Sequence, residues 1–103
     1  MLNAKAEITF TLEGRSFSGN KYPLRPSFRF DKGLLFSGNI ISDNLEYLIN
    51  KKYMVDVEFF TIEDEGYSTI KPYLKDGLDL VMQEGSQIIG LAKLSNFTYN
   101  DKQ

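Results

Sequence analysis

Apolar residues recur at every second position through much of this chain. In the stretch 6–12 they stand at positions 6, 8, 10 and 12, and the stretch 53–59 repeats the pattern. A period of two places the apolar side chains on one face of an extended strand and the polar ones on the other. The chain is therefore expected to form half-buried β-strands around a shared core.

Short polar and glycine-containing segments separate these stretches. Gly38 interrupts an apolar strand over 34–41, and glycine inside a strand often marks a bulge or bend. Six or seven short strands without long helical periods predict an all-β fold, a small closed antiparallel barrel or sandwich of six to seven strands. Residues 43–50 fit either one or two turns of helix or an irregular strand.

The length of 103 residues fits a single domain over 1–103 with one core. We expect the ends, residues 1–3 and 100–103, to be frayed. No apolar run reaches the ~18 residues of a membrane span, and no signal-peptide pattern opens the chain. The sequence therefore predicts a cytoplasmic protein without a membrane partner.

Cysteine and histidine are both absent. Their absence excludes disulfides, Cys/His zinc sites and imidazole acid–base chemistry. The acidic run Glu63-Asp64-Glu65 lacks the ligand spacing of a calcium loop and is interpreted as a solvated loop tip. We therefore expect no enzyme, no metal and no cofactor. Hydrolysis at carboxylates such as Glu63 or Asp76 is the remaining enzymatic hypothesis.

Four segments in order resemble the C-terminal β-barrel, the third domain, of translation elongation factor Tu. They are 4–8, Leu24-Arg-Pro-Ser-Phe-Arg-Phe30, Phe36-Ser-Gly-Asn-Ile40 and Asp76-Gly-Leu-Asp-Leu-Val-Met-Gln-Glu-Gly-Ser-Gln-Ile-Ile-Gly90. The resemblance covers about residues 4–97, with 62–70 as an extra loop segment. It implies a non-catalytic barrel that contacts the T-arm of aminoacyl-tRNA and protein partners. The phosphate-binding motif of the family's GTPase domain is absent, so we expect no nucleotide.

The resemblance also implies RNA-contacting positions. These are the turn Glu84-Gly85 together with Ser37, Ser27 and Arg15. Arg25 and Arg29 stand four residues apart, so they point to one face of a strand, which suits nucleic acid and solvent alike. Two basic positions of the family are glutamine here, and the net charge is −2, which weakens the attraction for RNA.

Two main hypotheses for function remain. The first is a non-enzymatic module that binds a protein, as an inhibitor, immunity protein or adaptor would. Its predicted contact residues are Glu63, Asp64, Glu65, Tyr67 and Tyr73. Tyrosine beside acidic residues suits an interface, and covering one end of the barrel explains the same residues equally well. The alternative is an RNA-binding module linked to translation, with tRNA as its partner.

Overall fold

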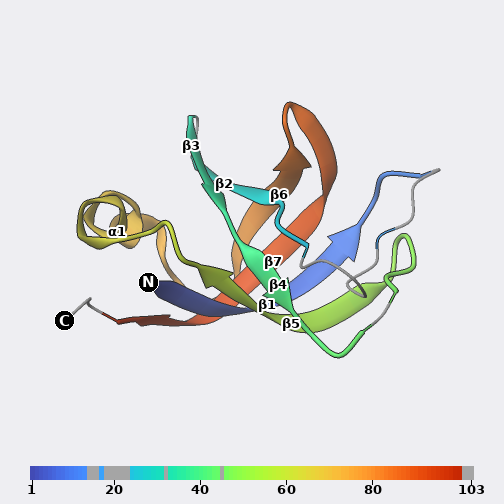
Figure 1. Ribbon diagram of the computed structural model, residues 1–103, viewed down its shortest axis with the longest axis horizontal. Coiled ribbons are helices and arrows are strands. Elements are labelled where there is room, and N and C mark those ends of the chain that lie inside the picture. Colours follow the sequence, from blue (N-terminus) through green and yellow to red (C-terminus); the bar gives the residue numbers. More distant parts are fainter. Residues whose placement is uncertain (14–16, 18–23, 32, 45, 101–103) are drawn as a thin grey trace.

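The computed structural model describes residues 1–13, 17, 24–31, 33–44 and 46–100. Figure 1 shows strands that curl around a common interior, with one short helix at the end where both chain termini lie. In chain order the elements are β1 (Leu2–Phe10), β2 (Ser27–Asp31), β3 (Leu34–Ser37), β4 (Asn39–Ile41), β5 (Lys52–Phe59), α1 (Asp64–Ile70), the 3₁₀ turn η1 (Lys71–Tyr73), β6 (Leu78–Glu84) and β7 (Gln87–Tyr99).

The seven strands form one antiparallel sheet in the order β3-β2-β6-β7-β1-β5-β4. The sheet is curled into a half-barrel. Neighbouring strands in this order are often far apart in sequence, so the sheet joins both halves of the chain. The predicted all-β antiparallel fold of six to seven strands is confirmed, as one curled sheet and not as two stacked sheets.

The two end strands of the sheet, β3 and β4, are separated only by Gly38. The Gly38 amide donates to the Pro26 carbonyl at 3.0 Å, which ties this corner to the chain just before β2. A Cβ atom at position 38 would lie 2.7 Å from side-chain atoms of both Phe28 and Val57. The sequence therefore places glycine where the backbone turns against the core, and the predicted interruption at Gly38 is confirmed.

Alternation decides which side chains fill the interior. In β5, Val55, Val57 and Phe59 are buried, whereas Asp56 between them is exposed. The Phe59 ring lies 5.1 Å from the ring of Phe28 in an edge-to-face arrangement, which is a favoured geometry for buried aromatic pairs. The inward faces that were predicted for the stretches 6–12 and 53–59 are confirmed, with Leu12 and Tyr53 only partly buried against the core.

The start of the chain is ordered, and the prediction that residues 1–3 fray is wrong. Leu2 is fully buried and pairs with Phe59 on β5. The Met1 amino group donates to the Asn100 carbonyl at 2.9 Å, and the Asn100 amide donates to the Met1 carbonyl at 3.1 Å. Burial of Leu2 and pairing of β1 on both sides hold this terminus, while residues 101–103 lie outside the described part.

The segment 62–70 was predicted to be an extra loop, and it contains the helix α1 instead. Ile62 and Ile70 stand before and at the end of this helix, and both are fully buried in the hydrophobic core. Asp64 and Glu65 occupy the first turn, where the helix dipole favours negative charge. Two apolar anchors thus hold seven residues in a helix that would be too short to form alone.

The other helical candidate, residues 43–50, contains no helix within its described residues. Tyr47 there is buried and forms an isolated β-bridge with Phe17. In the part of the chain that the structure describes, neither α1 nor η1 is long and apolar enough to cross a membrane.

Candidate functional site

The predicted protein-contact residues lie along α1 and η1. Tyr67 stacks flat on Tyr99 of β7, with ring centres 3.8 Å apart and planes 2° from parallel. The Tyr99 hydroxyl donates to Asp64 Oδ1 at 2.6 Å, and a Glu63 carboxylate oxygen lies 3.5 Å from the Met1 amino nitrogen. Most of these side chains therefore contact the chain itself, and the Glu65 side chain is exposed to solvent.

Tyr73 connects η1 to the end of β2. Its hydroxyl donates to Asp31 Oδ2 at 3.0 Å. The hydrogen bond to Asp31 and the negative charge of that carboxylate raise the pKa of Tyr73 above its ordinary value of 10.0. The α1–η1 segment thus contacts β7 through Asp64 and Tyr67 and β2 through Tyr73.

Asp31→Asn is expected to lower the pKa of Tyr73, because the substitution removes the charge that disfavours the tyrosinate. Since the folded-state pKa is raised, the interaction stabilises the fold below pH 10 and is lost as the pH rises through the raised pKa. A titration of the Tyr73 ¹³Cζ resonance by NMR measures the shift. An unchanged midpoint in the variant would contradict the assigned hydrogen bond.

Four positions that the resemblance implies for RNA contact share one end of the sheet. Ser27 on β2 pairs with Ser37 on β3 and, on its other side, with Gln83 on β6. Glu84 and Gly85 follow directly, and Gly85 has a φ of 57°, which suits glycine in a tight turn. Gln83 itself is buried and donates to the Gly85 carbonyl at 2.6 Å, so its side chain supports the turn.

The arginines divide between two environments. Arg29 is exposed on β2 while Phe28 and Phe30 are buried, so the predicted opposition of these side chains is confirmed. Arg25 precedes the strand, and its guanidinium carbon lies 5.5 Å from the centre of the Phe60 ring, within cation–π range. Arg15 lies outside the described residues.

The solvent face of the sheet carries an apolar surface that sequence reasoning did not identify. Arg29 pairs across the strands with Leu35 on β3 and with Val81 on β6. Val81 in turn pairs with Leu91 on β7. Leu35 is 42% exposed, Leu91 is 52% exposed, and Ile88 on the same strand is 50% exposed. We call Leu35, Val81, Ile88 and Leu91, together with Arg29, the outer patch.

A break in the alternation of β7 creates part of this patch. The pairing of β6 with β7 shifts its register next to Gln83. As a result Ile89 and Gly90 are both buried, whereas Ile88 and Leu91 on either side of them are exposed. A β-bulge re-aims side chains in this way, and its position could not be read from a run of apolar residues.

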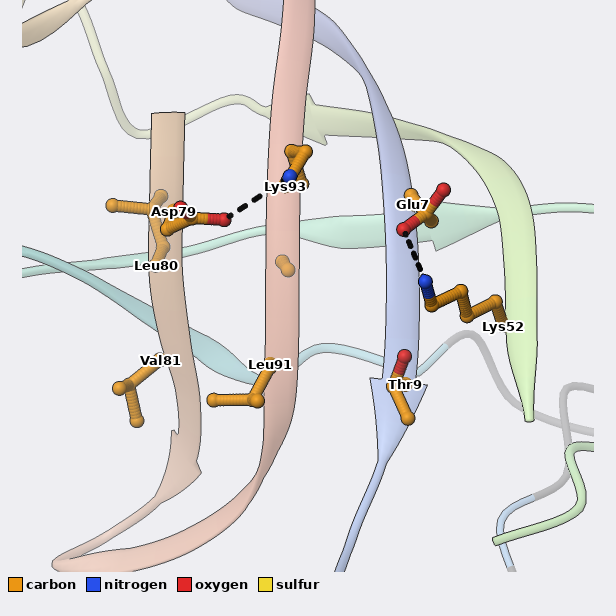
Figure 2. A pocket seen from close by; sticks show the side chains of 9 residues that line it. Glu7, Thr9, Lys52, Asp79, Leu80, Val81, Leu91 and Lys93 are labelled. Atoms are coloured by element: carbon orange, nitrogen blue, oxygen red, sulfur yellow. Dashed lines mark ion pairs between the residues drawn. The ribbon is translucent and has the colours of Figure 1, made fainter. Parts of the chain in front are cut away.

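A hollow of about 330 Å³ lies on the outer patch side of β6, β7 and β1. Figure 2 shows Val81 and Leu91 along its apolar part and Thr9 on the neighbouring strand. The hollow is open to solvent and mainly apolar beside Leu91. Such a surface can accept an apolar side chain.

Charged residues at the edge of the hollow are paired with one another. Lys93 Nζ lies 4.0 Å from Asp79 Oδ1, and Lys52 Nζ lies 3.7 Å from Glu7 Oε1 (Figure 2). Arg29, by contrast, forms no ion pair with a described residue. Within the same part of the chain, no group of three or more acidic residues could hold a metal ion.

No protein-family model matches this chain, and no curated protein matches it. The structure shows a small all-β half-barrel, and neither comparison identifies it as the third domain of elongation factor Tu.

Proposed function

We propose that this chain is a non-enzymatic protein-binding module that docks through the outer patch. The observation that carries the proposal is the group of apolar side chains on the solvent face of the sheet. They are Leu35 on β3, the half-buried Val81 on β6, and Ile88 and Leu91 on β7, and Arg29 on β2 stands between Leu35 and Val81. An antiparallel sheet with one face on the core usually keeps the other face polar. Contiguous exposed apolar side chains with a polar border are typical of protein interaction sites.

The neighbouring surface of the same sheet supports this interpretation. On the outer face of β1 the residues Asn3, Lys5, Glu7 and Thr9 are all polar, and Lys5 Nζ lies 2.6 Å from Asp56 Oδ1 on β5. The outer face of β5 is polar except for Met54, which is 65% exposed. The outer face of β1 therefore has the polar composition that a solvated face requires. Because the outer patch belongs to the same sheet and departs from that composition, we infer a role in contact with a partner.

The acidic segment on α1 takes a secondary place in this proposal. Asp64, Tyr67 and Tyr73 form contacts within the chain, which favours a role in covering the end of the half-barrel. Glu65 is exposed and remains available to a partner that also reaches this end. An inhibitor, an immunity protein or an adaptor would act through such surfaces without chemistry of its own.

Photo-crosslinking tests the proposal. A benzophenone amino acid at position 91 is expected to yield a discrete adduct in an extract of cells that produce the chain. The same group at position 98 is the matched control, because Thr98 is exposed on the same strand and does not belong to the outer patch. The position-91 adduct should disappear on protease treatment and survive ribonuclease. Equal adducts from both positions, or none from position 91, would contradict docking through the outer patch.

As an alternative we propose an RNA-binding module that recognises a T-arm-like structure in tRNA. The specific observation in its favour is that Ser27, Ser37 and the Glu84-Gly85 turn lie at one end of the sheet. Binding of tRNA should then weaken steeply with salt, with a log–log slope of roughly −0.7 to −0.9 for each phosphate contacted. Ser37→Asp should weaken tRNA binding relative to the unchanged protein at the same salt concentration. Absence of binding at about 50 mM salt would rule the alternative out.

A further inference from the structure

We propose that the partner presents a large apolar side chain and, about 10 Å from it, a carboxylate that pairs with Arg29. The distance follows from the sheet, because Arg29 on β2 and Leu91 on β7 are separated by β6, and strands lie about 4.8 Å apart. This inference rests on the proposed function and adds the chemistry of the partner.

The apolar half of the site is the hollow next to Leu91. Its volume of about 330 Å³ is at the lower end of the range for ligand pockets. A space of this size accepts one large side chain and not a whole structural element. Val81 and Leu91 are the groups that lose contact with water when it is filled, and the ion pairs Asp79–Lys93 and Glu7–Lys52 remain at the border.

The charge of the partner follows from the pairing of the charges already present. The acidic groups Asp79 and Glu7 each have a lysine within 4.0 Å, so the two negative charges at the hollow are already matched by two positive ones. Arg29 has Leu35 and Val81 as its cross-strand neighbours and no ion pair with a described residue.

A partner that covers the patch excludes water around the guanidinium of Arg29. The ion pair between Arg29 and a bidentate carboxylate of the partner becomes stronger as the local dielectric falls. A cation of the partner at the same place would instead be buried beside the positive charge of Arg29, which is unfavourable. Charge complementarity therefore selects an acidic segment and disfavours a basic one.

The spacing limits how such a segment is built. In an extended peptide, side chains on one face lie about 7 Å apart for two residues and about 13 Å apart for four. Both values are within reach of the flexible arginine side chain. We therefore expect an acidic residue two or four positions from a large apolar residue in an extended segment.

A selection from a phage-displayed library of random linear peptides tests this chemistry. Peptides enriched on the unchanged protein should carry a Leu, Phe or Trp with an Asp or Glu two or four positions away. On Arg29→Glu the enriched peptides should carry Lys or Arg in place of the acid. Leu91→Asp should weaken binding of the first set by roughly tenfold or more, as removal of a central contact does. Thr98→Asp on the polar end of β7 is the control and should leave binding unchanged.

Several results would overturn the inference. If the enriched peptides bind the Arg29→Glu variant with the same affinity as the unchanged protein, the partner's carboxylate does not pair with Arg29. Dimerisation in sedimentation experiments that is lost in Leu91→Asp would show that a second copy occupies the patch, and Leu91-dependent binding of tRNA would assign the patch to RNA. The two hypotheses can fail separately. If the proposed function is wrong, position 91 gives no protein adduct. If only this inference is wrong, the adduct still forms and Arg29→Glu does not change it.

Discussion

Gly90→Ala is expected to destabilise the fold by about 3 kcal/mol or more, which is the upper range for overpacking a core. A Cβ atom at position 90 would lie 2.4 Å from the Thr9 carbonyl oxygen, 2.8 Å from Met82 Cε and 3.1 Å from Phe10 Cα. Two of these three atoms belong to the backbone of β1, which cannot move aside without breaking its pairing with β7. The methyl group therefore has to separate the two central strands of the sheet.

Thermal unfolding measures this effect. For a chain of this length each 1 kcal/mol shifts Tm by about 4–8 °C, so Gly90→Ala should lower Tm by about 12 °C or more. Gly66→Ala is the matched control, because position 66 lies within α1 and an added Cβ meets nothing closer than 3.6 Å. That change should stabilise the protein by about 0.5–1 kcal/mol, the helical preference of alanine over glycine. Similar Tm values for the two variants would contradict the close approach of β1 and β7.

Phe59→Ala is expected to cost about 3–5 kcal/mol of the free energy of unfolding. Phe59 is fully buried, and its ring meets Phe28 at 5.1 Å and Phe30 at 5.6 Å, both edge-on. Truncation removes two aromatic contacts and leaves a cavity between β2 and β5, strands that are far apart in the sheet order. The lost contacts are those through which β2 and β5 meet in the core of the curled sheet.

Urea denaturation of Phe59→Ala should show a lower midpoint, and Met54→Ala provides the comparison on the same strand. Met54 is 65% exposed, so its truncation should change stability by no more than about 0.5 kcal/mol. Phe59→Leu should recover part of the loss by refilling the cavity. Equal losses for Phe59→Ala and Met54→Ala would show that β5 does not present the faces described above.

The strands could be predicted because the alternation of polar and apolar residues within each strand determines which side chains face the core. In β1 each apolar residue alternates with a polar one, and β5 follows the same pattern except for Met54. The helix α1 was not predictable from its own residues, since seven positions with Gly66 among them have little helical tendency. It depends on burial of Ile62 and Ile70 and on the stack of Tyr67 with Tyr99, a residue 32 positions further along the chain.

The outer patch was hidden in the sequence for a related reason. Leu35 is far in sequence from Val81 and Leu91, which lie on the consecutive strands β6 and β7, and only the strand order brings the three onto one surface. The bulge in β7 then turns Ile88 and Leu91 outward and Ile89 inward. Arg29 was identified as an exposed residue, but its apolar cross-strand neighbours could not be known before the pairing of β2 with β3 and β6.

The central claim is that the large apolar side chains of the outer patch serve contact with a partner and are dispensable for folding. Thermal unfolding of Leu91→Asp and Leu94→Asp tests it most directly, since Leu91 is half exposed and Leu94, on the same strand, is fully buried. We expect Leu91→Asp to unfold cooperatively with a Tm lowered by no more than about 8 °C, as a surface change in a strand allows. Leu94→Asp should show no folded state, because it buries an unpaired charge. Loss of the folded state in Leu91→Asp as well would contradict the claim.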